Sequence, residues 1–390
     1  MLLDHDFDSR RASILRRAVP RFRLNRAPLA CAAVWALAAL AGCSGGASSS
    51  TSPPTSTSGS GSVSSKPMLK GLVTQGPAIT STPPTNQFAE LYAHPGVYSA
   101  AVIQLFWSQL EPTQGGFDDN ALTAALAILA QYNAEYPATP VVAKLRIFMG
   151  VGTPGWVATA TGPVTVTASS GQPMTIGKFW TPAYIALWQQ LQQHLAGEFD
   201  GSAAIGEVAI TSCSSLTGEP FVLPSTSADI SALLAAGYTD AEGKSCLTGA
   251  PQDYADWKIT PLDYTFNAFT EIGSGAPVPD TGFSVQEMAA FRAALGSRGV
   301  VANHGLQPQL TLDQTPIYAE FQTLATQASS QGTVSPLEFQ TISPTVDWAE
   351  AIALGLTYKP TELEIWDTVT AGGQAVISTQ QLTTWAADLQ

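Results

Sequence analysis

Two glutamates stand where a carboxyl group could do chemistry. Glu219 ends a polar turn that follows the apolar, strand-like run at residues 205–211. Glu338 lies in a second such run, residues 336–341, where the period-two alternation of a strand puts it on the same face as Gln340. Two carboxyl groups in one cleft can divide the roles of general acid and of nucleophile or base, which is what hydrolysis of a glycosidic bond requires.

The segments that must position these residues alternate between strand-like and helical patterns from residue 70 to the end of the chain. Thr181 before Pro182 predicts a helix start, and Ser284 followed by Glu287 is typical of a capping box. Parallel strands need crossover connections, which the helical segments provide. The sequence therefore predicts an α/β fold, a single-domain (β/α)8 TIM barrel. The expected strands are residues 70–74, 99–106, 140–148, 205–211, 262–268, 299–303, 336–341 and 362–366.

The stretch from residue 223 to 261 interrupts this alternation after the fourth strand. It contains one short helical segment, residues 230–236, and polar turns around Cys246. Loops at the carboxyl ends of barrel strands build the active site in this fold. We therefore expect an enlarged loop after strand 4 that contributes to function.

Residues 107–118 read Trp-Ser-Gln-Leu-Glu-Pro-Thr-Gln-Gly-Gly-Phe-Asp and lie between an apolar run and a helical pattern. The pattern W-x-x-L-E-P-x-x-G-x-F-D resembles the loop after the second strand in retaining glycoside hydrolases of the (β/α)8 clan, clan A, and in particular their beta-galactosidase type. The resemblance spans roughly residues 99–220. It implies a glycoside hydrolase that acts on an extracellular or envelope polysaccharide.

In this family the acid/base glutamate ends the fourth strand, typically between an Asn and a Pro, and the nucleophile ends the seventh. The resemblance implies that Glu219 is the acid/base and Glu338 the nucleophile. However, Gly218 stands in place of the Asn, and Gln340 can occupy the rim of the seventh strand instead of Glu338. Two alternatives stay open: a non-catalytic barrel that binds glycan, and an inverting or substrate-assisted hydrolase in which Glu219 works with Glu364.

The same resemblance implies a set of substrate-binding residues near the ends of the strands. A charged side chain inside a strand must be paired or face a polar cavity, so we expect Arg146 to pair with Glu219 or Glu338. Flat aromatic faces suit the C–H surface of a sugar ring, and three Trp are expected to stack on the substrate. The predicted substrate-binding residues are Trp107, Arg146, Trp156, Asn267, His304, Gln340, Glu364 and Trp366.

Residues 1–42 carry the features of a secretory signal: seven Arg, an apolar stretch at 29–40 and small residues before Cys43. The Leu-Ala-Gly-Cys pattern resembles a bacterial lipobox, which implies lipidation of Cys43. Residues 43–66 are mostly Ser, Gly, Thr and Pro and predict a flexible tether, with the barrel at 67–390. We expect an exported lipoprotein that faces the periplasm or cell surface. A plain signal peptide or a single membrane anchor is the alternative.

The chain is acidic, with 17 basic and 30 acidic residues. Residues 1–42 hold 7 of the basic and 3 of the acidic ones, so the remainder has 10 against 27. Nucleic acid and anionic lipid head groups are poor partners for such a surface, whereas a neutral sugar polymer is compatible with it. We therefore expect a carbohydrate partner and no nucleic acid.

Two cysteines, Cys213 and Cys246, lie within the expected barrel domain. In an exported protein such a pair predicts a disulfide, and two free buried thiols are the alternative. The four His are scattered, with no paired ligand spacing, and no Gly-rich phosphate fingerprint follows a strand. We therefore expect no metal and no cofactor.

Overall fold

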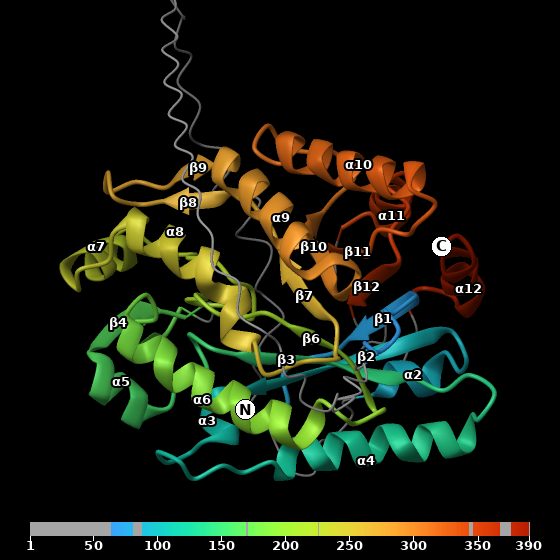
Figure 1. Cartoon of the computed structure of the whole chain (residues 1–390), viewed down its shortest axis with the longest axis horizontal. Coiled ribbons are helices and arrows are strands. Elements are labelled where there is room, and N and C mark those ends of the chain that lie inside the picture. The colour runs from blue at the N-terminus through green and yellow to red at the C-terminus, as the bar shows by residue number, and fades with distance from the viewer. Residues whose placement is uncertain are drawn as a thin grey trace, which may run out of the picture. The chain divides into compact units, whose positions relative to one another are not determined.

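Eight parallel strands close into a barrel in the order β1-β12-β11-β10-β7-β6-β3-β2 (Figure 1). The computed structural model describes residues 64–80, 88–168, 171–224, 226–342, 346–366 and 376–389. The predicted (β/α)8 barrel is confirmed, and the predicted signal, Cys43 and most of the tether lie outside the described residues. The barrel strands are β1 (Gly71–Gln75), β2 (Tyr98–Phe106), β3 (Val142–Phe148), β6 (Ile205–Ala209), β7 (Leu262–Thr265), β10 (Gly299–Leu306), β11 (Leu337–Thr341) and β12 (Glu362–Trp366).

Helices fill the crossovers between the strands and surround the barrel (Figure 1). Among the described residues, no helix is long and apolar enough to cross a membrane. The helices are α2 (Ala89–Ala93), α3 (Trp107–Leu110), α4 (Asn120–Glu135), α5 (Gly155–Thr161), α6 (Pro182–Phe199), α7 (Ser227–Ala235), α8 (Asp240–Gly249), α9 (Thr281–Leu295), α10 (Thr315–Ser330), α11 (Trp348–Leu356) and α12 (Thr379–Ala387), with 3-10 turns η1 (Ala250–Tyr254) and η2 (Gly296–Arg298).

The start of α9 differs from the prediction. The helix begins a turn earlier than Ser284, and Asp280 is its N-cap, accepting a hydrogen bond from the backbone N–H of Phe283 at 3.1 Å. Ser284 is instead buried and bonds to the segment after β7: its hydroxyl donates to the carbonyl of Asn267 at 2.8 Å and accepts from the N–H of Phe269 at 2.9 Å. The expected capping box is therefore wrong, because the hydroxyl serves a tertiary contact.

The connection from β6 to β7 is long and holds α7, α8 and η1, as expected for an enlarged loop after the fourth strand. Two hairpins were not predicted. One pairs β4 (Pro163–Thr167) with β5 (Pro173–Gly177), and the other pairs β8 (Phe269–Glu271) with β9 (Val278–Asp280). Each hairpin lies in the connection after a barrel strand, so both enlarge the region where this fold builds its active sites.

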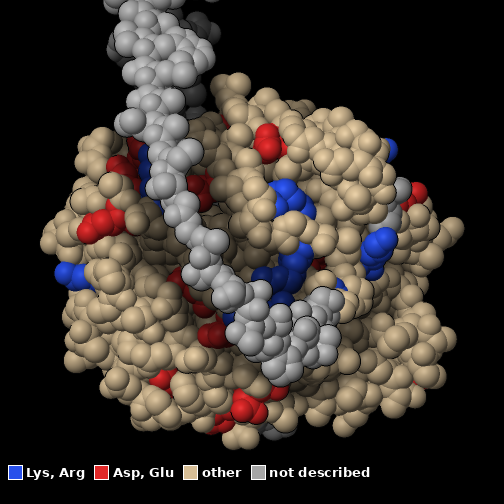
Figure 2. All heavy atoms as spheres, viewed as in Figure 1, with Lys and Arg blue, Asp and Glu red and all other residues tan. Residues whose placement is uncertain are grey.

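The two faces of a barrel strand meet different surroundings. On β3, Leu145 and Ile147 belong to the apolar core, whereas the alternating residues Lys144 and Arg146 are also fully buried. Since the side chains of a strand alternate, one set packs against the helices and the other fills the barrel. Figure 2 shows that most of the visible molecular surface carries no charge. Several charged residues, Lys144 and Arg146 among them, are instead buried inside the barrel.

Candidate active site

Charged residues line the inside of the barrel, on β3, β6, β7, β11 and β12. Each of these side chains is almost completely buried. The strand register places Lys144 beside Glu207 and Glu338 beside Glu362. We call this set the charged interior, and its members are Lys144, Arg146, Glu207, Asp263, Glu338, Glu362 and Glu364.

Lys144 is the central cation of the charged interior. Its Nζ lies 2.9 Å from Asp263, 3.0 Å from Glu207, 3.3 Å from Glu338 and 3.4 Å from Glu364. Burial disfavours its charge, but the surrounding carboxylates outweigh burial and raise the pKa of Lys144. One ammonium therefore holds together carboxylates from four strands.

The carboxyl groups of the charged interior outnumber its cations, and several of these carboxyl groups have a raised pKa. Burial raises the pKa of Glu207 to about 7 and that of Asp263 to about 6, although Lys144 opposes the shift. Burial and the charge of Glu207 raise the pKa of Glu362 well above its ordinary value. Part of the charged interior therefore carries protons near neutral pH.

Arg146 pairs with Glu364 across the barrel. Its two terminal nitrogens lie 2.8 Å from the two carboxylate oxygens, and a further contact of 3.1 Å reaches Gln75. The expected pairing of Arg146 with Glu219 or Glu338 is wrong, because Glu364 on β12 offers a planar, two-point partner. Both residues lie inside the barrel as predicted, but they are engaged with each other.

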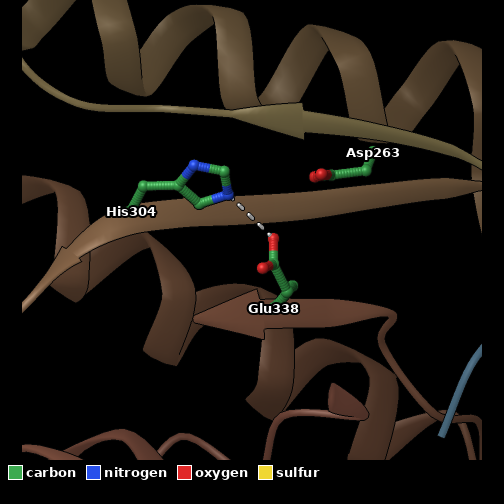
Figure 3. A group of neighbouring side chains, drawn as sticks. All are labelled: Asp263, His304 and Glu338. Carbon is green, nitrogen blue, oxygen red and sulfur yellow. Dashed lines mark hydrogen bonds and ion pairs between the residues drawn. The ribbon is translucent and has the colours of Figure 1, made fainter. Parts of the chain in front are cut away.

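His304, on β10, bridges the two predicted catalytic carboxylates. Its Nδ1 lies 3.2 Å from Oε1 of Glu219, and its Nε2 lies 3.3 Å from Oε2 of Glu338 and 3.1 Å from the hydroxyl of Thr265. Figure 3 shows the contact with Glu338. Burial lowers the pKa of His304, but the charge of Glu338 and the hydrogen bonds to both carboxylates raise it to about 9. The imidazole is therefore charged at neutral pH.

Glu338 and Gln340 both face the barrel interior, as the alternation predicted. Glu338 has no exposed surface, and although burial disfavours its charge, Lys144 and His304 outweigh burial and lower its pKa. Gln340 is 3% exposed, and its carbonyl oxygen has no hydrogen-bond partner among the described residues. Glu338 is thus ionised and fully buried inside the barrel. Gln340 lies two residues closer to the carboxyl end of β11.

Glu219 does not end a strand. β6 ends at Ala209, and the residues that follow return over the barrel as a loop, residues 210–223, which we call the Glu219 loop. Ser215 joins the two ends of this loop. Its N–H donates to the backbone carbonyl of Phe221 at 3.3 Å, and its hydroxyl accepts from the N–H of Leu223 at 2.9 Å. The prediction that Glu219 closes the fourth strand is therefore corrected, yet the loop still brings its carboxyl group to His304.

Gly218 explains how closely this loop approaches the barrel. A Cβ atom at Gly218 would lie 2.8 Å from the ring of Phe148 and 3.1 Å from the Cδ of Arg146. An Asn at this position, as the resemblance expected, would meet these side chains. The tip of the loop therefore rests on the end of β3, and the side chain of Glu219 remains 14% exposed.

The predicted disulfide between Cys213 and Cys246 is confirmed, with a Cα–Cα distance of 5.9 Å. It joins the start of the Glu219 loop to α8, and Cys213 adopts a positive φ of 66°. The bond thus ties the loop that follows β6 to the insertion between β6 and β7. Through this bond the insertion supports the position of Glu219.

The motif at residues 107–118 has a structural role in the fold. Trp107 is fully buried in edge contacts with Tyr184 and Trp188, and its indole N–H donates to Glu111 at 2.9 Å. The indole N–H of Trp156 donates to the backbone carbonyl of Glu111 at 3.0 Å. A stacking role does not fit Trp107, because neither of its faces is open, whereas Trp156 is only partly buried.

Trp366 and Asn267 lie near the carboxyl ends of their strands. The indole of Trp366 donates to the carbonyl of Thr341 at 2.9 Å and is partly exposed. The amide oxygen of Asn267 accepts from the side chain of Asn303 at 2.8 Å. Both side chains are partly exposed, and among the described residues their hydrogen bonds go to partners other than His304, Glu219 and Glu338.

The structure also brings Asp263, which the sequence analysis did not single out, beside His304 and Glu338, which it did. Asp263, His304 and Glu338 offer ligand atoms that lie within 4.8 Å of one another. They come from three adjacent strands, so no sequence spacing could reveal them. The signal that could have found Glu207, Asp263 and Glu362 is the one that indicated Arg146, a charged residue inside an apolar strand.

The barrel resembles several solved glycoside hydrolases. The catalytic domain of beta-amylase from Paenibacillus polymyxa is 11% identical, with a TM-score of 0.53 over 82% of this chain and 100% of that one. Endo-glycoceramidase II from Rhodococcus sp. is 13% identical, with a TM-score of 0.50 over 81% of this chain and 78% of that one. The chain thus shares their barrel fold.

The beta-galactosidase from the psychrophilic Marinomonas ef1 is 12% identical, with a TM-score of 0.50 over 81% of this chain. This chain covers 59% of the length of that enzyme. No protein-family model and no curated protein matches the sequence. The resemblance to clan A glycoside hydrolases is therefore confirmed at the level of the fold, and identities this low support nothing finer.

Proposed function

We propose that this protein is a glycoside hydrolase that cleaves O-glycosidic bonds of an extracellular or envelope polysaccharide. The observation that carries the proposal is the contact of one imidazole, His304, with both predicted carboxylates, Glu219 at 3.2 Å and Glu338 at 3.3 Å. These residues come from separate parts of the chain and meet at one end of a barrel whose fold neighbours act on carbohydrates. Paired carboxyl groups are what the reaction needs.

The surroundings of the two carboxyl groups suit different roles. Glu219 is partly exposed although most of its loop is buried, so it is placed to protonate the oxygen of the leaving group. Glu338 is held ionised by Lys144 and His304, so it suits the role of base or nucleophile. In this structure the Glu219 loop lies over the charged interior, and the proposal requires that loop to lift when a glycan binds.

The spacing favours inversion of the sugar's configuration. The two nitrogens of an imidazole point away from each other, so Glu219 and Glu338 lie on opposite sides of the His304 ring. Such a separation suits the roughly 6.5–9.5 Å of inverting enzymes, which leave room for water, better than the about 5–5.5 Å of retaining ones. We therefore propose inversion, in place of the retention that the family resemblance implied.

A second function, glycan binding without cleavage, is favoured by the depth of Glu338. This carboxylate has no exposed surface and forms an ion pair of 3.3 Å with Lys144. A carboxylate that never leaves such a pair cannot attack a sugar. In that case the partly exposed Trp156 and Trp366 would hold a glycan at the barrel mouth, and Glu219 would only hydrogen-bond it.

We also propose that the chain is exported and anchored to a membrane through a lipid on Cys43. The Cys213–Cys246 disulfide supports this location, because such bonds persist in oxidising compartments. Metabolic labelling with a radioactive fatty acid tests the proposal directly. Label should enter the wild-type chain and be lost in Cys43→Ser, and equal labelling of both would remove lipidation from the proposal.

Activity assays on a panel of aryl glycosides and polysaccharides test the catalytic proposal. The purified full chain is compared with Glu219→Gln and Glu338→Gln, and Glu198→Gln, an exposed residue of α6, is the matched control. Loss of a general acid lowers the rate by about 10²–10⁴-fold, so both site variants should fall in that range while the control keeps its rate. The anomer released first, followed by NMR, tests inversion.

Three outcomes are informative. Cleavage that depends on both carboxyl groups supports the hydrolase, and cleavage that survives Glu338→Gln but not Glu219→Gln moves the second role to another residue such as Glu364. A folded wild type that binds a glycan without cleaving it establishes the binding barrel instead.

A further inference from the structure

Three side chains of different strands converge beneath the Glu219 loop. Asp263 on β7, His304 on β10 and Glu338 on β11 each offer one ligand atom, and these atoms lie within 4.8 Å of one another. The three strands are neighbours in the barrel, and Figure 3 shows the side chains pointing toward one another. Each is at least nine-tenths buried. One imidazole nitrogen and two carboxylate oxygens form a common ligand set for a divalent ion.

Three carboxylate oxygens in this group have no hydrogen-bond partner among the described residues: both oxygens of Asp263 and Oε1 of Glu338. Asp263 and Glu338 each place one oxygen on Lys144, at 2.9 and 3.3 Å. The other oxygens, Oδ1 of Asp263 and Oε1 of Glu338, are buried and have no hydrogen-bond partner among the described residues. A buried carboxylate oxygen without a partner is costly, so these atoms point to a ligand or a proton.

The far side of the imidazole has the partner that a metal-binding histidine needs. Metal-bound His usually donates its other N–H to a carboxylate, which fixes the ring and its tautomer. Nδ1 of His304 lies 3.2 Å from Oε1 of Glu219, while Nε2 faces Glu338 and Asp263. The ring is therefore already oriented with Nε2 toward the shared space.

The ammonium of Lys144 already contacts Asp263 and Glu338, so it competes with any ion that would bind these two carboxylates. Its other contacts nevertheless allow a second cation to bind nearby. Three further carboxylates surround its ammonium: Glu207 at 3.0 Å, Glu364 at 3.4 Å and Glu362 at 4.0 Å. A small displacement toward these three would keep the ammonium paired. Five buried carboxyl groups share the interior with Lys144, Arg146 and His304, so acidic groups outnumber basic ones there.

We propose that Asp263, His304 and Glu338 bind one divalent transition-metal ion, of the kind represented by Zn²⁺ and Mn²⁺. Binding requires the neutral imidazole, so it releases a proton. The ion would occupy Nε2 of His304 and an oxygen of Glu338, two groups that cleavage as proposed above also needs. Bound metal should therefore inhibit hydrolysis, but its binding does not depend on whether the protein is a hydrolase.

Isothermal titration calorimetry of the metal-free full chain with ZnCl₂ and with MnCl₂ tests the site. The protein is first treated with a chelator and dialysed, and long equilibration is used because the three ligands are buried. Mn²⁺ controls for the thiols of Cys31 and Cys43, which attract Zn²⁺ more strongly. Asp263→Asn removes a ligand, Glu219→Gln removes only the partner of Nδ1, and exposed Glu198→Gln is the matched control.

We expect one site in the wild type and in Glu198→Gln, lost in Asp263→Asn and about 10–100-fold weaker in Glu219→Gln. Thermal unfolding with added metal gives a second readout: the midpoint should rise for the wild type and stay constant for Asp263→Asn. If Asp263→Asn does not fold, Glu219→Gln still tests the site. No binding to the folded wild type, or equal binding to all four proteins, would overturn the proposal.

Discussion

The Nδ1 atom of His304 lies 3.2 Å from Oε1 of Glu219, a residue that the chain places 85 positions away on a loop outside the barrel wall. The same ring reaches Glu338 through Nε2 at 3.3 Å. An accessible carboxyl group and a buried carboxylate are thus connected through one imidazole. A change in the charge of either carboxylate should therefore change the pKa of His304.

The first prediction concerns the pKa of His304. In the metal-free protein this pKa is raised to about 9, because the charge of Glu338 and hydrogen bonds to both carboxylates overcome the effect of burial. Glu338→Gln should lower it most, since it removes both a charge and a bond, and Glu219→Gln should lower it less. Histidine NMR titrations with a chelator present measure both shifts.

The signal of His194, which pairs with Asp119 at 2.9 Å instead, serves as the internal control for these titrations. An unchanged His304 signal in Glu338→Gln would show that the bridge does not form in solution. A larger shift in Glu219→Gln than in Glu338→Gln would reverse the order of the two partners.

The second prediction is that stability falls as pH rises from 5 to 8. Burial raises the pKa of Glu207 to about 7 and of Asp253 to about 6, from 4.5 and 3.8. A raised folded-state pKa stabilises the fold fully below the unfolded value, and that contribution is lost as pH passes the folded value. The unfolding free energy should drop by on the order of 3 kcal/mol, since each unit is worth about 1.4 kcal/mol.

Urea unfolding at several pH values measures this dependence. Glu207→Gln removes one of the titrating groups and should flatten the fall, while the exposed Glu198→Gln should leave it unchanged. Glu338, whose pKa is lowered, contributes in the opposite sense and only in acid, below its ordinary value of 4.5. A stability that is constant or rises between pH 5 and 8 would show that these carboxyl groups are not buried as described.

The pattern of apolar runs was sufficient to predict the barrel but not what fills it. The predicted strand ends at residue 303, whereas β10 extends to Leu306, because His304 and Gly305 interrupt the apolar pattern of the sequence. Similarly, Glu207 and Asp263 lie within predicted strands but were not predicted as site residues. Their meaning depends on Lys144, which neutralises them from another strand, and sequence patterns do not show partners across a barrel.

The candidate site was predicted in part for the same reason. Glu219, Glu338 and His304 were proposed from separate segments, and the structure shows that they meet. The role of Trp107 was not predictable from its motif, because burial depends on how α6 packs against it. The path of the Glu219 loop could not be predicted from the sequence either, because its return over the barrel depends on the Cys213–Cys246 disulfide and on the close packing of Gly218.

The third prediction is that this disulfide stabilises the domain and positions Glu219. Cys213 and Cys246 close a loop with a sequence separation of 33 residues, and removal of such a bond costs about 2–4 kcal/mol. The double variant Cys213→Ser/Cys246→Ser should therefore unfold at lower denaturant and lose activity. Reductant should reproduce both effects in the wild type and add nothing in the double variant. Unchanged activity would mean that α8 does not support the Glu219 loop.

The fourth prediction tests the contact that seats this loop. Gly218 leaves no space for a side chain, because a Cβ would lie 2.8 Å from the ring of Phe148. Gly218→Asn should lift the tip of the loop, cost about 1–3 kcal/mol of stability, and weaken the bond from Glu219 to His304. Gly249→Ala, on α8 with nothing within 4 Å, is the matched control and should leave stability and activity unchanged. If Gly218→Asn is as stable and active as the wild type, the loop can accommodate a side chain at this position. Close packing would then not explain why Gly218 replaces the Asn that the family resemblance predicts.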